Sequence, residues 1–150
     1  MNAQRGFTLI EVLMVVTILG VLLVIAVPAY NDYTTRGKIV EAHSQLADLR
    51  VKMEQFYQDN RNYGTGGCGT TAGGVTTVTM PATKYFSYSC TLGAGGQTFA
   101  LSALSKAPAL GAGAGDYTFT VNETNAKATT KFKGAASSLG CWIIKKGDAC

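Results

Sequence analysis

The feature that most constrains this chain is an apolar stretch from Phe7 to Tyr30, in which Glu11 is the only charged side chain. A helix rises about 1.5 Å per residue, so these residues would form a helix of roughly 36 Å, enough to cross a hydrocarbon core of about 30 Å. Apolar side chains cannot face water over such a length, and they have to lie in lipid or against like helices. We therefore expect a membrane-compatible segment and not a purely cytosolic globular protein.

The length leaves room for one further domain, and the excess positive charge lies at the carboxy-terminal end of the chain. The chain has 150 residues, of which 47% are hydrophobic and 15% charged, against about 25% charged in a typical soluble domain. Lys and Arg number 13 and Asp and Glu number 9, which gives a net charge of +4. Residues 127–150 alone account for this surplus, because they hold one aspartate, Asp148, and five lysines. We call these five the C-terminal lysines: Lys127, Lys131, Lys133, Lys145 and Lys146.

A secretory signal peptide that is removed is the main alternative to a retained membrane helix. Such a peptide has an apolar run of about 7 to 15 residues followed by a small-residue cleavage site. Here the apolar run is longer, and the residues at its end, Pro28-Ala29-Tyr30-Asn31, form no such site. We therefore expect the segment to be retained in the mature protein.

Glu11 is unusual, because a carboxylate within an apolar helix costs on the order of 2.5 to 3.5 kcal/mol on insertion scales and so needs a partner. If the chain were cleaved after Gly6, the new α-amino group of Phe7 would lie one helical turn from Glu11, or from the Glu11 of a neighbouring copy. A different explanation is that Glu11 sits at the headgroup level and snorkels, since it lies near a helix end. The position thus indicates either an assembly role or an interfacial one.

The segment Arg5-Gly6-Phe7-Thr8-Leu9-Ile10-Glu11, followed by an unbroken apolar run, closely resembles the processing site of type IV prepilins and pseudopilins. In that family a membrane aspartyl protease, the prepilin peptidase, cuts after the glycine and methylates the new amino terminus. The resemblance implies that residues 1–6 are a leader peptide, that Phe7 becomes the N-methylated first residue, and that Glu11 registers subunits during filament assembly. It also implies that residues 7–30 are the transmembrane and polymerisation helix and that residues 31–150 are the globular head.

An amphipathic pattern follows the apolar stretch. Its apolar residues recur three or four positions apart: Ile39, Ala42, Leu46, Leu49, Met53 and Phe56. This spacing predicts a helix that packs on the head's own sheet, since a coiled coil needs more heptads. Residues 61–64 are expected to end it, so that one helix runs from about Phe7 to about Asn60. Gly20 and Pro28 weaken a helix, and we expect a kink or local unwinding between them.

The remainder of the chain predicts an antiparallel sheet. Residues 64–84 are rich in Gly and Thr and are expected to form a long loop. Apolar residues alternate in segments 86–92, 99–103 and 117–121, which indicates three strands separated by glycine-rich connections, and a short fourth strand is expected at 142–145. A long helix followed by such a sheet is an α+β fold, in agreement with the ladle-shaped pilin fold that the resemblance implies.

Four cysteines lie outside the apolar segment: Cys68, Cys90, Cys141 and Cys150. An even number in an exported chain implies disulfides, for which three connectivities exist. We favour Cys68 with Cys90 and Cys141 with Cys150, because each bridge closes a local loop. The second bridge also resembles the disulfide-closed C-terminal loop of pilins. No pair has the C-x₂-C spacing of a zinc site, so we expect no metal.

The residues offer no catalytic arrangement. The only histidine, His43, falls on the predicted helix, where we expect it to be solvated. Oxidised cysteines cannot act as nucleophiles, the glycine-rich segments lack phosphate-binding motifs, and the carboxylates do not cluster. We therefore expect neither an enzyme nor a bound cofactor.

The function that the resemblance implies is that of a structural subunit of a type IV pilus. The chain would cross the inner membrane once, serve as a substrate of the prepilin peptidase, and be polymerised by the pilus assembly machinery into a homo-oligomeric, extracellular filament. The fibre would support adhesion to host or abiotic surfaces, twitching motility or DNA uptake. The sequence does not decide between a major and a minor pilin.

Two alternatives remain open. In the first, the chain is a minor competence pilin whose C-terminal lysines, with Phe132 and Trp142 nearby, capture DNA. A merely solvated lysine surface explains the same residues, and the lack of arginine among them weakens any base-reading role. In the second, the chain is a pseudopilin of a type II secretion system, for which the leader and helix are equally suited.

Overall fold

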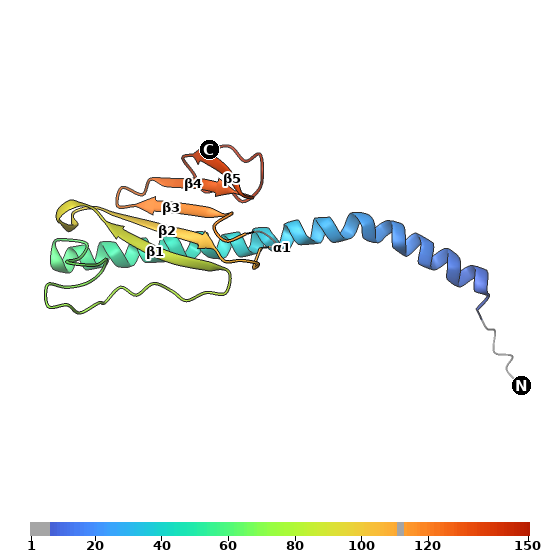
Figure 1. Cartoon of the computed structure of the whole chain (residues 1–150), viewed down its shortest axis with the longest axis horizontal. Helices are drawn as coiled ribbons and strands as arrows, with labels where there is room; N and C mark the ends of the chain where they lie inside the picture. The colour runs from blue at the N-terminus through green and yellow to red at the C-terminus, as the bar shows by residue number, and fades with distance from the viewer. Residues whose placement is uncertain (1–6, 111–112) are drawn as a thin grey trace, which may run out of the picture. The chain divides into compact units, whose positions relative to one another are not determined.

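The computed structural model describes residues 7–110 and 113–150. The chain divides into two compact units, of which the first ends at Thr35 and the second is Arg36–Cys150. Helix α1 belongs to both units, and the strands all belong to the second (Figure 1). The elements are α1 (Leu9–Asn60), β1 (Phe86–Leu92), the short 3₁₀ helix η1 (Ala94–Gly96), β2 (Phe99–Ser105), β3 (Thr118–Asn122), β4 (Lys127–Phe132) and β5 (Ala135–Leu139).

Helix α1 continues through Gly20 and Pro28, so the expected local unwinding between them is absent from this structure. Proline removes one hydrogen bond, and a long helix can tolerate that loss because the flanking turns keep their own bonds. The helix ends at Asn60. Arg61 adopts a left-handed φ of 57°, and its N–H donates to the Tyr57 carbonyl at 2.8 Å. Arg61 therefore forms the left-handed cap that ends the helix, within the predicted residues 61–64.

The predicted amphipathic face of α1 is confirmed. All six of its apolar residues are buried: Ile39, Ala42, Leu46, Leu49, Met53 and Phe56. They share one hydrophobic core with the inward face of the sheet, to which Phe86, Phe99 and Phe119 contribute. A large apolar side chain stabilises such a core by about 1.5–3 kcal/mol when it is fully buried. The second half of α1 is therefore an integral part of the head.

The sheet is an antiparallel meander in the order β1-β2-β3-β4-β5, with the strands side by side in chain order (Figure 1). The first three strands lie where alternation predicts them. In β2, for example, Phe99, Leu101 and Ala103 are buried while Ala100 is exposed. The α+β fold with a long amino-terminal helix and a carboxy-terminal antiparallel sheet is thus confirmed.

Strands β4 and β5 were not predicted from the sequence. Strand β4 buries Thr129 and Phe132, three residues apart, because register shifts against both neighbouring strands interrupt the alternation near Thr130. Strand β5 consists mostly of Ala and Ser and has no fully buried residue. Neither segment carries the apolar period of two on which a strand prediction depends.

The prediction of a fourth strand at 142–145 was wrong. The backbone N–H groups of Ile144 and Lys145 both donate to Asp148 Oδ2, at 3.0 Å each, instead of to a neighbouring strand. A side-chain acceptor that takes up successive N–H groups favours a turn over a sheet ladder. Residues 142–145 therefore belong to a loop.

The long connection between α1 and β1 is a loop, as predicted, with one isolated bridge between Thr70 and Thr76. It is fixed to the head at several points. The Tyr63 N–H donates to the Gly96 carbonyl at 2.7 Å, and a disulfide joins Cys68 to Cys90 in β1. These links hold a segment of low hydrophobicity against the sheet.

Candidate functional site

The amino-terminal part of α1 presents a continuous apolar surface. Every large apolar side chain from Phe7 to Val27 is at least half exposed in the isolated subunit, with Phe7 at 83%. By length and composition, this helix could cross a membrane. An exposed apolar surface of this extent marks a site that lipid or another protein covers.

The first turn of α1 is capped by Thr8, whose Oγ1 accepts a hydrogen bond from the Glu11 N–H at 3.3 Å. Thr8 and Glu11 have the spacing of a capping box, and a carboxylate in the first turn interacts favourably with the helix dipole. The local cost of Glu11 is therefore smaller than in mid-helix. Gly6 and the predicted leader, residues 1–6, lie outside the described residues.

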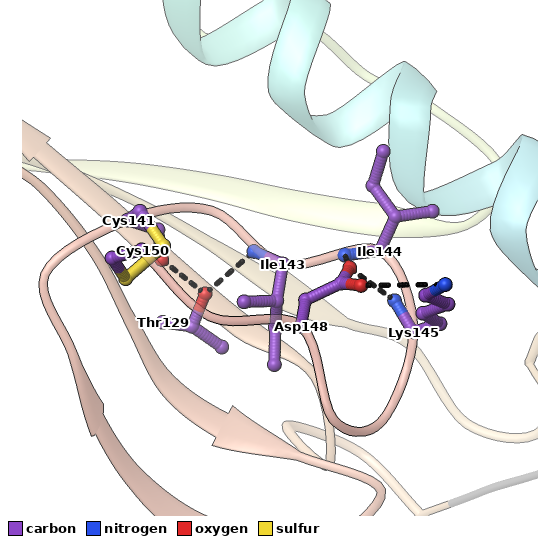
Figure 2. The surroundings of a disulfide bond; sticks show 7 residues. All are labelled: Thr129, Cys141, Ile143, Ile144, Lys145, Asp148 and Cys150. Atoms are coloured by element: carbon purple, nitrogen blue, oxygen red, sulfur yellow. Dashed lines mark hydrogen bonds and ion pairs between the residues drawn. A yellow bond between two sulfur atoms is a disulfide. The ribbon is translucent and has the colours of Figure 1, made fainter.

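The C-terminal loop is closed by a disulfide between Cys141 and Cys150, the pairing that we favoured from the sequence together with Cys68–Cys90. Thr129 of β4 fixes this loop to the sheet (Figure 2). Its side chain is fully buried; the hydroxyl donates to the Cys141 carbonyl at 2.7 Å and accepts from the Ile143 N–H at 3.2 Å. Ile143 itself is buried in the core. We call residues 141–150 the disulfide loop.

Asp148 holds the turn of the disulfide loop. Besides its two backbone hydrogen bonds, its Oδ1 lies 3.9 Å from the Lys145 Nζ (Figure 2). The N–H groups of Ile144 and Lys145, and then the charges of Lys145 and Arg36, lower the pKa of Asp148 below its ordinary value. The carboxylate is therefore ionised at neutral pH and stabilises the loop in this form.

His43 is not the solvated residue that we expected. Its ring stacks on Trp142 with a centroid distance of 5.1 Å and meets Phe119 edge-on at 4.6 Å. Burial, and then the charge of Lys127, lowers the pKa of His43 to about 4. Among the described residues, its Nε2 has no hydrogen-bond partner. The sequence could not show this, because the ring lies between α1, β3 and the disulfide loop, which are distant along the chain.

Trp142 links the disulfide loop to both α1 and the sheet. Its Nε1 donates to the Thr120 carbonyl at 2.7 Å, and the Lys127 ammonium lies 4.7 Å from the centroid of its ring. A cation over an indole face is attracted to it. The Trp142 ring of the disulfide loop therefore lies beside the Lys127 ammonium of β4.

The C-terminal lysines do not form one face. Lys127 pairs across the sheet with the buried Val121 and shares its helix-facing side, whereas Lys131 pairs with Thr118 and shares the outer side. Lys133 follows β4 with a left-handed φ of 52°, and Lys145 is paired with Asp148. The structure therefore brings Lys127 to Trp142 and separates Lys131 from both.

The described residues contain no group of three or more His, Cys, Asp or Glu side chains that could hold a metal ion. An open cavity of about 710 Å³ lies between the loop that follows α1 and the β1–β2 connection, and its lining residues carry no charged side chain. The cavity therefore lacks the charged side chains that a catalytic site would use. The roles of Thr129 and Asp148 could not be predicted from the sequence, since a buried hydroxyl and a loop cap leave no periodic pattern.

Comparison with known families gives two matches that together span most of the chain. Residues 1–27 match the family described as prokaryotic N-terminal methylation motif. Residues 28–113 match the family described as type IV minor pilin ComP, DNA uptake sequence receptor. The second match ends before β3, so it includes neither the C-terminal lysines nor the disulfide loop.

Similar proteins are fimbrial. A fimbrial protein of Moraxella nonliquefaciens is 42% identical over 79 residues, which are 53% of this chain and 51% of the relative. The type IV major fimbrial protein FimA of Dichelobacter nodosus is 45% identical over 58 residues, 39% of this chain and 36% of the relative. The chain thus aligns with about half or less of the length of these curated relatives. A solved type IV pilin from Shewanella oneidensis is 18% identical with a TM-score of 0.47, covering 63% of this chain and 90% of that one.

Proposed function

This chain belongs to the type IV pilins, in the family described as type IV minor pilin ComP, DNA uptake sequence receptor, and from that premise we propose that it is a pilus subunit that polymerises through its apolar helix. The observation that carries the proposal is the exposed apolar surface from Phe7 to Val27. Each large side chain there gains about 1.5–3 kcal/mol on leaving water. The subunit therefore needs lipid before assembly and neighbouring helices after it.

The same apolar surface supports a stage before assembly in which the subunit resides in a membrane, and we call this the membrane stage. We propose that the subunit crosses the inner membrane once, with residues 7–30 in lipid, and that the pilus assembly machinery moves it into an extracellular filament. The segment has no charged side chain besides Glu11, and it ends at Tyr30, a residue type that is enriched at membrane–water interfaces. Helix packing in the filament then replaces the lipid contacts.

The amino terminus supplies the assembly signal. We propose that the prepilin peptidase cleaves after Gly6 and that the amine of Phe7 is methylated. Glu11 lies in the first turn of α1 beside the Thr8 cap, one turn from that amine. A carboxylate in an apolar environment binds a positive amine strongly, so the amine of one subunit can select the Glu11 of the next.

A second candidate function, DNA capture, is favoured by the description of the matched family and by the cation–aromatic contact at Lys127. The Lys127 ammonium lies over a half-buried indole, from where it can contact a phosphate. Lys145 and Lys146 lie in the same loop as Trp142. Lysine lacks the bidentate geometry that reads bases, so these residues would hold the nucleic-acid backbone. Adhesion to host or abiotic surfaces is a further role of the assembled fibre.

Amino-terminal sequencing and intact mass of the protein sheared from cells test the proposal. We expect an abundant chain that begins at methylated Phe7. A chain that begins at Met1 and stays in the membrane would contradict both processing and assembly. A processed chain that shearing does not release would instead support the pseudopilin alternative.

A further inference from the structure

A second group of basic side chains gathers around Tyr85, apart from the C-terminal lysines. Lys38 lies in α1, Lys84 comes just before β1, and Lys106 follows β2. The Nζ atoms of Lys38 and Lys84 lie 5.0 and 5.6 Å from the centroid of the Tyr85 ring. The Lys106 N–H donates to the Tyr85 carbonyl at 2.9 Å. We call Lys38, Lys84 and Lys106 the Tyr85 lysines.

The contacts of the Tyr85 lysines hold them in place without cancelling their charge. The Lys38 Nζ donates to the Ala109 carbonyl at 2.9 Å, and the Lys106 Nζ donates to the Thr83 carbonyl at 2.7 Å. Carbonyls and an aromatic ring are neutral partners, so three positive charges remain on one part of the head.

The ion pairs of the described residues do not include the Tyr85 lysines. The ion pairs known within residues 7–110 and 113–150 join other side chains: Arg50 with Glu54, Lys52 with Asp48, and Lys145 with Asp148. Lys84 and Lys106 are exposed, and Lys38 is half-buried. Three ammonium groups with neutral contacts therefore gather at this part of the surface.

The chain places this surface within reach of a membrane. Lys38 follows Tyr30, at the end of the apolar segment, by eight residues, which span at most about 29 Å even when fully extended. Tyr33 is 77% exposed, and tyrosine is a residue that favours the membrane–water interface. Basic side chains this close to a membrane segment are attracted to anionic lipids.

We propose that the Tyr85 lysines bind the phosphate groups of anionic phospholipids and hold the head of the unassembled subunit at the membrane surface. This inference rests on the proposed membrane stage. Leaving the membrane then requires both the apolar helix and the head to exchange lipid for neighbouring subunits. The anionic headgroups supply the charge that the fold leaves uncompensated around Tyr85.

Lysine footprinting of the full chain in lipid nanodiscs tests this. One set of discs contains only phosphatidylcholine, and the other also contains phosphatidylglycerol, so that neither lipid has a reactive amine. We expect acetylation of Lys84 and Lys106 to slow about fivefold in the anionic discs at low salt, the factor that one lysine at an anionic surface is worth. Lys52, farther along α1, is the internal control and should react equally in both sets. Inorganic phosphate added to the zwitterionic discs should give no protection.

Hydrogen exchange on the same samples separates the two proposals. One outcome is slow exchange of residues 9–30 in both disc types, with acetylation of Lys84 and Lys106 at the same rate in both. It would overturn the proposal that the Tyr85 lysines bind lipid and leave the proposed membrane stage intact. Fast exchange of residues 9–30 in both disc types would overturn the proposed membrane stage, and the proposal that the Tyr85 lysines bind lipid would fail with it.

A pair of double variants gives an independent test. In the wild type, we expect residues 81–86 to exchange more slowly in the anionic discs than in the zwitterionic ones. In Lys84→Gln with Lys106→Gln, the exchange of residues 81–86 should no longer depend on lipid charge. The matched variant, Lys52→Gln with Arg61→Gln, changes the net charge equally and should keep the wild-type dependence. Loss of the dependence in both variants would mean that overall charge, and not this surface, attracts the head.

Discussion

Replacing Thr129 with valine tests how the disulfide loop is held to the sheet. Valine keeps the shape of the buried side chain and removes its hydroxyl, so the Cys141 carbonyl and the Ile143 N–H lose their shared partner. A buried polar group left without a partner costs about 1–3 kcal/mol. For two such groups, one of them partly reachable by water, we expect the free energy of unfolding to fall by about 2–4 kcal/mol.

Two further variants separate hydrogen bonding from packing. Thr129→Ser keeps the hydroxyl and removes one buried methyl group, which costs about 0.8 kcal/mol or slightly more. Thr130→Val removes an exposed hydroxyl whose contact with the Thr118 carbonyl is long, at 3.4 Å, so we expect a change within about 0.5 kcal/mol. We therefore expect Thr129→Val to destabilise the protein most, Thr129→Ser less, and Thr130→Val least.

Equilibrium urea unfolding of the detergent-solubilised full chain, with both disulfides intact, measures these differences. Trp142 is the only tryptophan and lies in the disulfide loop, so its fluorescence reports directly on this region. A Thr129→Val protein as stable as the wild type would refute the reasoning. So would a serine variant less stable than the valine variant, since packing would then outweigh the hydroxyl.

Three further predictions concern charge. The lowered pKa of His43 means that only the unfolded chain takes up a proton as pH falls from 6.5 to about 4, so stability should drop by about 2–3 kcal/mol over that range. His43→Phe should remove this drop in urea unfolding, and an unchanged pH profile would contradict it. Glu11→Ala should abolish sheared filaments while the subunit remains in the membrane; normal filament yield would exclude the assembly role. Changing all C-terminal lysines to Gln should lower the slope of DNA retention by filaments against log salt by about 0.9 for each phosphate that is no longer neutralised. An unaltered slope would place DNA binding elsewhere.

The elements that the sequence predicts correctly are those whose burial follows a simple period. The amphipathic face of α1 repeats every three or four residues, and β1 to β3 alternate, so the pattern of apolar residues coincides with the pattern of burial. The two disulfides close short loops, and this locality was enough to select one of three pairings.

The elements that the sequence does not predict depend on contacts between distant segments. A bulge shifts the buried positions of β4, and Asp148 turns a segment that reads as a strand into a loop. His43 reads as a surface residue because its two aromatic neighbours come from β3 and the disulfide loop. The C-terminal lysines read as one patch along the chain, but Lys127 and Lys131 lie on opposite faces of the sheet.

The density of filaments sheared from cells that make this chain shows directly whether the apolar helix joins the subunits. We expect residues 9–30 of successive subunits to pack together along the filament axis, away from water, with each Phe7 amine beside the Glu11 of a neighbour. Density in which these helices face solvent, or filaments that lack this chain altogether, would contradict it.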